Sequence, residues 1–185
     1  MQASNLDYTF ATGGEYELRC AIDLYGQSLL RYCHNILCDY FEAQDVVQIT
    51  FIKAYNKRKS FKSGTSLSAW LYRIAYTTCI DSLRKKKLLF FMSQTNTESM
   101  HFMHQTNVDS KFISDDLKVA LLALSPAERA LVFSRVIDEK SYADLETIYH
   151  VSATTLRKRY ERAKTKLSKA LKEVDSYYKG LEETK

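Results

Sequence analysis

The chain has 185 residues, and 27 Lys and Arg against 22 Asp and Glu give it a formal net charge of +5 at pH 7. Gly occurs 5 times and Pro once, far below the roughly 12% that the two make up in average chains. This scarcity excludes collagen-like and Gly/Pro-rich disordered proteins and argues against β-sandwiches, which need many turns. The sequence contains no Rossmann or phosphate-loop glycine motif, so nucleotide-binding folds of those kinds are also disfavoured.

The remaining composition, 45% apolar and 26% charged, is typical of a soluble globular protein with one or two domains. The first 14 residues lack the basic start and apolar core of a signal peptide. No apolar run approaches the roughly 18 residues of a spanning helix, so we expect no direct membrane insertion. The four cysteines lie in apolar helical patterns and are expected to be reduced thiols in the cytoplasm.

Apolar residues at alternating steps of three and four predict a first helix over residues 16–38. The stripe consists of Leu18, Ile22, Tyr25, Leu29, Cys33 and Ile36. A polar break at residues 39–42 separates it from a second helix over about residues 43–59.

The second helix carries two stripes roughly 120° apart. One is apolar and suits the domain core, and it comprises Val47, Phe51, Ala54 and Tyr55. The other mixes apolar side chains with an acid and amides, and it comprises Asp45, Gln48, Ile49, Ile52 and Asn56. This mixture suits contact with a partner protein, although a helix buried on both sides within a bundle would have the same pattern.

Residues 60–66 (SFKSGTS) are expected to form a loop because Gly64 stands among four hydroxyl residues. A third helix is predicted over about residues 67–87, and it ends in the basic run 84–87. Residues 88–114 lose the periodicity and become rich in polar residues, so we interpret them as a flexible linker. The predicted organisation is a first domain over 1–87, the linker, and a second domain over 115–185.

The second domain has clear helix starts. Ser125, Pro126 and Glu128 form a capping box with Pro in the first turn, and Ser141 begins a weaker cap of the same type. A short helix over residues 142–149, a tight turn, and a long helix from about residue 153 to 178 follow.

The long helix is strongly basic, because eight Lys or Arg and one acid occur between residues 152 and 172. A short helix, a tight turn and a longer basic helix predict a helix-turn-helix motif. Its second helix would enter the major groove of DNA, with early side chains at base edges and later cations at phosphates. A merely solvated charged face is the alternative interpretation.

The first domain offers a different nucleic-acid chemistry. The loop 60–66, the face with Tyr72, Arg73 and Tyr76, and the basic run 84–87 combine hydroxyls, aromatic rings and cations. Single-stranded nucleic acid is bound by stacking on rings and by cations along the phosphates, and a Ser/Gly/Thr loop can supply a small polar pocket for a flipped base. Ordinary core packing of the tyrosines is the alternative.

Catalytic and metal sites are not predicted. The group Cys33-His34-x-x-x-Cys38 has no evident fourth ligand for a tetrahedral metal site, and no nucleophile–base motif occurs. We therefore expect no enzyme, no metal and no cofactor.

Four segments together resemble a bacterial sigma factor of the extracytoplasmic function (ECF) group, within the sigma-70 family. They are DVVQ-x-TF-x-KAY at residues 45–55, AWLYRIA at 69–75 with D-x-x-RKKK at 81–87, LSP-x-ER at 124–129, and SYADL at 141–145 with TLRKR at 155–159 and RAK-x-KL at 162–167. These segments span most of the chain, and their order, with a linker between the halves, is more specific than any one of them.

The resemblance implies an all-α fold with two small helical domains and a terminal helix-turn-helix. It also implies a protein that binds core RNA polymerase, through the β′ clamp helices and the β flap, and that recognises and helps to melt promoter DNA. The residues implied for core polymerase are Asp45, Gln48, Ile49 and Ile52. Those implied for the melted minus-ten element are Ser60, Phe61, Lys62, Ser63, Gly64, Tyr72, Arg73, Tyr76, Thr77, Arg84 and Lys85. Those implied for the duplex minus-thirty-five element are Thr154, Thr155, Arg157, Lys158, Glu161, Arg162 and Lys166.

The resemblance also makes an anti-sigma factor a common partner. The sequence departs from the family pattern at Gln44, at Tyr76-Thr77 and at Glu161, and His150 stands where a turn glycine is common, which predicts a left-handed backbone there. The alternative function is a helix-turn-helix regulator whose first domain senses a ligand or dimerises. Such a regulator should bind duplex DNA unaided, whereas a sigma factor should need core polymerase.

Overall fold

The computed structural model describes residues 3–93 and 115–182, and within these ranges it contains helices and no strand. The first domain comprises α1 (Ala3–Thr9), α2 (Glu15–Leu37), α3 (Tyr40–Asn56), the single 3-10 turn η1 (Arg58–Ser60) and α4 (Leu67–Ser93). The second comprises α5 (Asp115–Leu122), α6 (Pro126–Val136), α7 (Tyr142–Tyr149) and α8 (Ala153–Glu182). The predicted class, all-α with two small helical domains, is confirmed.

Local capping explains where several helices begin. The Asp39 carboxylate accepts a hydrogen bond from the Glu42 backbone N–H at 3.0 Å and so caps α3. The predicted capping box of Ser125 and Glu128 is present at the start of α6, and Ser141 forms the same motif with Asp144 at the start of α7. His150 has a φ of 51°, so the left-handed turn expected before α8 is also confirmed.

Several helix boundaries differ from those predicted. The second predicted helix was placed too late, because α3 begins at Tyr40 and ends at Asn56. α4 continues to Ser93, past residue 88, where the linker was expected to start. The segment has no Gly or Pro to end the helix, and Lys, Leu and Met are good helix formers. The rest of the predicted linker, residues 94–114, lies outside the described residues.

α1 was not anticipated from the sequence, because it is short and weakly periodic. It is held by Leu6 and Phe10, both buried. The Phe10 ring makes edge contacts with Phe61 and Trp70 at centroid distances of 6.2 and 6.1 Å. These contacts attach α1 to the segment that joins α3 to α4.

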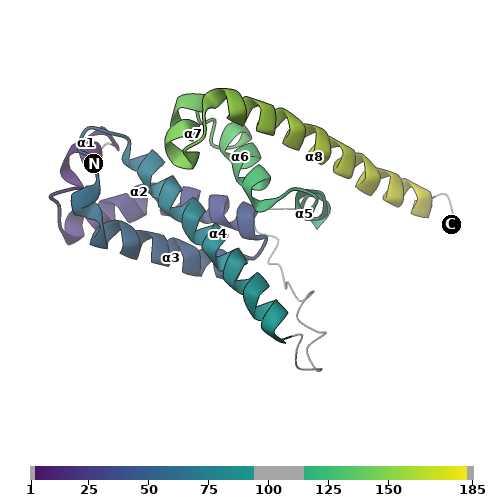
Figure 1. The fold of residues 1–185 in the computed structure, drawn as a ribbon, viewed down its shortest axis with the longest axis horizontal. Helices are drawn as coiled ribbons and strands as arrows, with labels where there is room; N and C mark the ends of the chain where they lie inside the picture. The colour runs from purple at the N-terminus through teal and green to yellow at the C-terminus, as the bar shows by residue number, and fades with distance from the viewer. Residues whose placement is uncertain (1–2, 94–114, 183–185) are drawn as a thin grey trace.

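In Figure 1, α2, α3 and α4 form a bundle, α6 and α7 lie over it, and α8 extends across the second domain toward the C-terminus. The two domains share one core, because residues of α6, α7 and α8 pack in the same buried cluster as those of α2 and α4. Arg129 of α6 is buried at this junction and donates to the Ile36 carbonyl of α2, with Nε at 3.0 Å and Nη2 at 2.5 Å. The Ile36 carbonyl, in the last turn of α2, thus accepts hydrogen bonds from the second domain.

Candidate functional site

The mixed stripe of α3 faces solvent. Asp45, Gln48, Ile49, Ile52 and Asn56 are all exposed, and Ile52 keeps 59% of its surface accessible. On the other side of the helix Phe51 and Ala54 are buried, while Val47 and Tyr55 are half-buried. The predicted division of α3 into a core stripe and an exposed stripe is therefore what the structure contains, and the alternative of burial on both sides is wrong.

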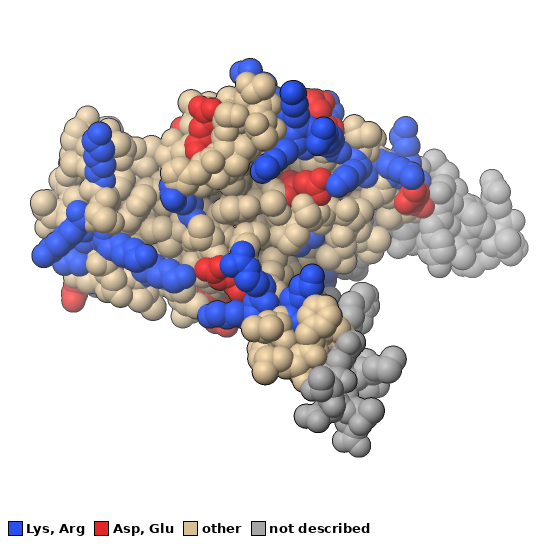
Figure 2. Space-filling view, viewed as in Figure 1, with Lys and Arg blue, Asp and Glu red and all other residues tan. Residues whose placement is uncertain are grey.

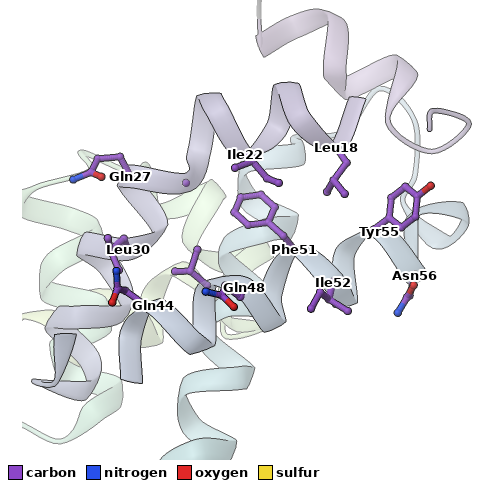
Figure 3. A pocket seen from close by; sticks show the side chains of 12 residues that line it. Leu18, Ile22, Gln27, Leu30, Gln44, Gln48, Phe51, Ile52, Tyr55 and Asn56 are labelled. Carbon is purple, nitrogen blue, oxygen red and sulfur yellow. The ribbon is translucent and has the colours of Figure 1, made fainter. Parts of the chain in front are cut away.

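Beside this stripe lies a largely apolar groove of about 550 Å³ between α2 and α3 (Figure 3). Ile22 and Leu18 of α2 stand on one wall, and Phe51, Gln48 and Ile52 of α3 stand on the other. Ile22 was expected in the core but keeps 43% of its surface accessible, because it lines this open groove. An open apolar groove bordered by amides suits a protein partner.

The loop over residues 60–66 is anchored from below and open above. Phe61 is buried with 4% of its surface accessible, and its ring lies 5.2 Å from that of Trp70. Ser60, Lys62, Ser63, Gly64 and Thr65 are exposed. Gly64 has a φ of 80°, in the left-handed region that favours glycine. The exposed part of the loop presents hydroxyls, a cation and bare backbone, whereas Phe61 supports it and has no free face.

On α4, the face expected to meet DNA is partly covered by the second domain. Tyr72 is buried with 2% of its surface accessible, and the Asp138 carboxyl group lies close to its hydroxyl. Lys140 lies over the Tyr72 ring at 4.6 Å and donates to the Ser68 hydroxyl at 2.9 Å. Sequence reasoning missed this coverage, because periodicity marks a helix face as amphipathic without saying which element packs on it.

The other α4 residues predicted to bind DNA are partly covered or exposed. Tyr76 is half-buried against the Tyr149 ring, at a centroid distance of 4.8 Å, and Arg73 is half-buried. Thr77, Arg84 and Lys85 are exposed. The apolar end of the helix beyond Lys87 is also exposed, with Leu89 at 64%.

Burial dominates the electrostatics of the domain junction. It raises the pKa of the Tyr72, Tyr32 and Tyr149 hydroxyls further above neutral pH. Burial also raises the pKa of Asp138, while the neighbouring Tyr72 hydroxyl and the charge of Lys140 act in the opposite direction. The domain junction thus contains a group of polar side chains surrounded by buried apolar residues.

α8 carries the basic face predicted from the sequence. Leu156 and Ala163 are buried against the second domain, while Thr154, Arg157, Lys158, Glu161 and Arg162 are exposed. Thr155 is half-buried near the cap of the helix, and Lys166 makes an ion pair with Glu128 at 2.6 Å. Figure 2 shows Lys and Arg gathered over α8 and over the end of the first domain that holds α1.

Metal and membrane sites have no counterpart in the part of the chain that the structure describes. There, no cluster of three or more His, Cys, Asp and Glu side chains could hold a metal ion. Among the same residues, no helix combines the length and the apolar character needed to cross a bilayer. Cys33, Cys38 and Cys79 are buried free thiols.

Comparison with known proteins adds the decisive observation. Residues 21–88 match the family model of sigma-70 region 2, and residues 114–167 match that of sigma-70 region 4. The chain belongs to the sigma-70 family, in its ECF group. The two matches cover the two helical domains and together most of the chain.

Two curated relatives are sigma factors that this chain matches over most of their length. The ECF RNA polymerase sigma factor SigW of Bacillus subtilis is 29% identical over 164 residues, which cover 83% of this chain and 88% of SigW. The sigma factor YlaC of the same organism is 29% identical and covers 78% and 86% of the two chains. The sigma factor RpoE, solved in complex with the anti-sigma factor NepR from Bartonella quintana, superposes with a TM-score of 0.68 at 26% identity, over 83% of this chain and 96% of that one.

A structure of CnrH in complex with the cytosolic domain of CnrY superposes with a TM-score of 0.67 at 20% identity, covering 92% and 97% of the chains, and supports the fold. As a sigma factor, the chain binds core RNA polymerase and directs it to specific promoters at the initiation of transcription. This membership decides against the alternative of a self-sufficient helix-turn-helix regulator.

Proposed function

We propose that core RNA polymerase docks on the exposed stripe of α3, with Asp45, Gln48, Ile49 and Ile52 against the β′ clamp helices. The groove between α2 and α3 adjoins this stripe, and Gln48 and Ile52 belong to both. The supporting observation is that two large aliphatic side chains remain in solvent on a helix whose other face is well buried. An apolar patch of this kind, rimmed by polar groups, is typical of a protein-binding surface.

We propose that the melted minus-ten strand binds the loop 60–66 and the adjoining part of α4. Ser60, Lys62, Ser63 and Gly64 are exposed for this role, and the exposed residues Thr77, Arg84 and Lys85 extend the surface along α4. Phe61 acts from beneath as a support. Tyr72, Tyr76 and Arg73 can reach DNA after the second domain moves off α4.

We propose that the duplex minus-thirty-five element binds the exposed face of α8. Thr154, Lys158, Glu161 and Arg162 face the groove, with Thr155, Arg157 and Lys166 at its border. Glu161 can accept a hydrogen bond from the cytosine N4 amino group. The β flap of the polymerase is the expected contact of the rest of this domain.

The chain performs no covalent chemistry in this account, and polymerase supplies the reaction. Binding energy toward unstacked bases favours the open strand over the duplex, which is the thermodynamic content of assisted melting. An anti-sigma factor is a further proposed partner, since the structural neighbour RpoE was solved with one.

The docking proposal is tested by reversing one charge on α3. Asp45→Arg should abolish pull-down of core polymerase while circular dichroism and thermal unfolding stay unchanged, because Asp45 is exposed. Asp23→Arg is the matched control, since it makes the same change on an exposed site of α2 that does not line the groove. Wild-type affinity of Asp45→Arg would refute the docking role. Run-off transcription on a promoter library then measures specificity.

A further inference from the structure

The N-terminal helix α1 is built into the loop that is proposed to receive the melted base. α1 precedes the region matched by the family model, which begins at residue 21. The loop 60–66 and α1 nevertheless lie together, since Phe10 packs on Phe61 and Trp70. Figure 1 places α1 beside the start of α4, at the end of the molecule away from α5 and the C-terminal part of α8.

Three hydrogen bonds attach the loop and the start of α4 to α1. The Gly64 N–H donates to the Asp7 carbonyl at 2.7 Å, and the Ser63 hydroxyl donates to the Tyr8 carbonyl at 3.0 Å. The Asp7 carboxylate accepts from the Leu67 N–H at 2.8 Å and so caps α4. On the α1 side these bonds use only main-chain carbonyls and the Asp7 carboxylate, so the Tyr8 side chain is not needed to hold the loop.

The Tyr8 ring instead lies on the outer side of the loop. A Cβ atom added to Gly64 would stand 3.3 Å from Tyr8 Cε1, so the ring borders the bare Gly64 backbone. Tyr8 keeps 65% of its surface accessible, and it borders a loop in which Lys62, Ser63 and Thr65 are exposed. A large aromatic ring left in water, beside hydroxyls and a cation, has the composition of a stacking site for a nucleic-acid base.

We propose that Tyr8 is a base-stacking residue of the minus-ten site, and that α1 is therefore part of the DNA-binding surface. This inference rests on the proposed role of the loop 60–66. An unpaired base of the non-template strand stacks on the Tyr8 ring, hydroxyls of the loop contact its polar edge, and Lys62 meets the neighbouring phosphate. Gly64 is suited to this site because the absence of a side chain leaves the ring and the backbone open on the same side.

The test uses holoenzyme assembled from the full chain and a bacterial core polymerase. Fork-shaped DNA with a duplex upstream arm and a single-stranded downstream tail, both randomised, is first enriched on the wild-type holoenzyme. Binding of the enriched forks and of their fully duplex versions is then measured for Tyr8→Ala, Tyr8→Phe, Lys62→Ala and Tyr16→Ala. Tyr16 is the matched control, because it is a tyrosine with the same 65% exposure, located on α2.

Loss of one base–aromatic stack corresponds to a weakening of roughly 5- to 150-fold. We expect this loss for Tyr8→Ala on forks alone, with duplex affinity and core binding unchanged. Tyr8→Phe and Tyr16→Ala should bind like the wild type, since a phenyl ring also stacks.

The inference is overturned if Tyr8→Ala binds forks normally while Lys62→Ala weakens them, and the proposed function of the loop then stands. It is also overturned if Tyr8→Ala weakens core binding instead, because the ring would then contact polymerase. If the wild-type holoenzyme enriches no fork over its duplex, the loop assignment fails together with the inference.

Discussion

The hydroxyls of Tyr32 and Tyr149, 117 positions apart in the chain, share a hydrogen bond of 3.0 Å across the junction of the two domains. The Tyr149 hydroxyl also shares one with the Ser134 hydroxyl at 3.0 Å, and the Tyr149 ring packs on Tyr76. Tyr149 is thus the point at which α2, α4 and α6 meet α7. The junction covers Tyr72, so the proposed access of DNA to this part of α4 requires separation of the domains.

Tyr149→Phe should loosen the junction while preserving its apolar contacts. The substitution leaves the buried hydroxyl of Tyr32 without this partner, which costs about 1–3 kcal/mol. We expect faster proteolysis between the domains and a longer distance between fluorophores placed on α3 and α8. Thr147→Ala, on the exposed side of the same helix, is the control, and an unchanged distance in Tyr149→Phe would contradict the role of the hydroxyl chain.

Arg129→Met should destabilise the whole fold more than any exposed substitution. Arg129 donates to the carbonyls of Ile36 and Leu124, and hydrogen bonds from a charged donor contribute roughly 1.5–3 kcal/mol each. Met retains the apolar stem and removes the donors. Denaturant unfolding should give a lower midpoint than for Arg162→Ala, and equal midpoints would mean that water satisfies these carbonyls.

Protonation of His34 should lower the free energy of unfolding at mildly acidic pH. Burial lowers the pKa of this imidazole, and the charge of Lys118 lowers it further. His34 therefore binds its proton more tightly in the unfolded chain than in the folded one. The free energy of unfolding has its full value above the unfolded-state pKa of about 6.5, and it decreases as the pH falls below that value. Chemical unfolding between pH 7.5 and 5 should show this loss, with a limiting slope of about 1.4 kcal/mol per pH unit.

The variant His34→Asn serves as the reference for that measurement, because it cannot take up the proton. It should be less stable at pH 7.5 and should show a flatter dependence on pH. A wild-type profile parallel to that of the variant would assign the pH dependence to other groups.

Arg162→Ala should weaken minus-thirty-five binding by the holoenzyme. If Arg162 contacts only phosphate, the loss is equal for all upstream sequences and the salt dependence falls by about one charge. If it contacts a base edge, the loss is about 1–3 kcal/mol and is confined to one position. Lys169→Ala, further along α8, is the control for simple loss of positive charge. Unchanged upstream binding would remove Arg162 from the interface.

Several elements could be predicted because the interactions that form them are short-range. The capping boxes at Ser125 and Ser141 involve residues three apart, and the division of α3 into two stripes follows from its period of 3.6 residues. The structure then decided that the mixed stripe is exposed. The ordered motifs likewise identified the family without coordinates. The residue-level assignments to polymerase and DNA remain predictions.

Only the tertiary structure decided which faces are covered. Tyr72 is buried because Asp138 and Lys140 of the second domain lie on it. Tyr8 lies beside the loop 60–66 because the neighbouring residue Asp7 forms hydrogen bonds with Gly64 and Leu67. The amino-acid sequence determined the helices and their amphipathic faces, because hydrogen bonds and side-chain spacing within a helix are local. It could not determine how those faces pair, because an apolar stripe gains similar free energy against any complementary surface, and the choice among surfaces depends on residues distant in the chain.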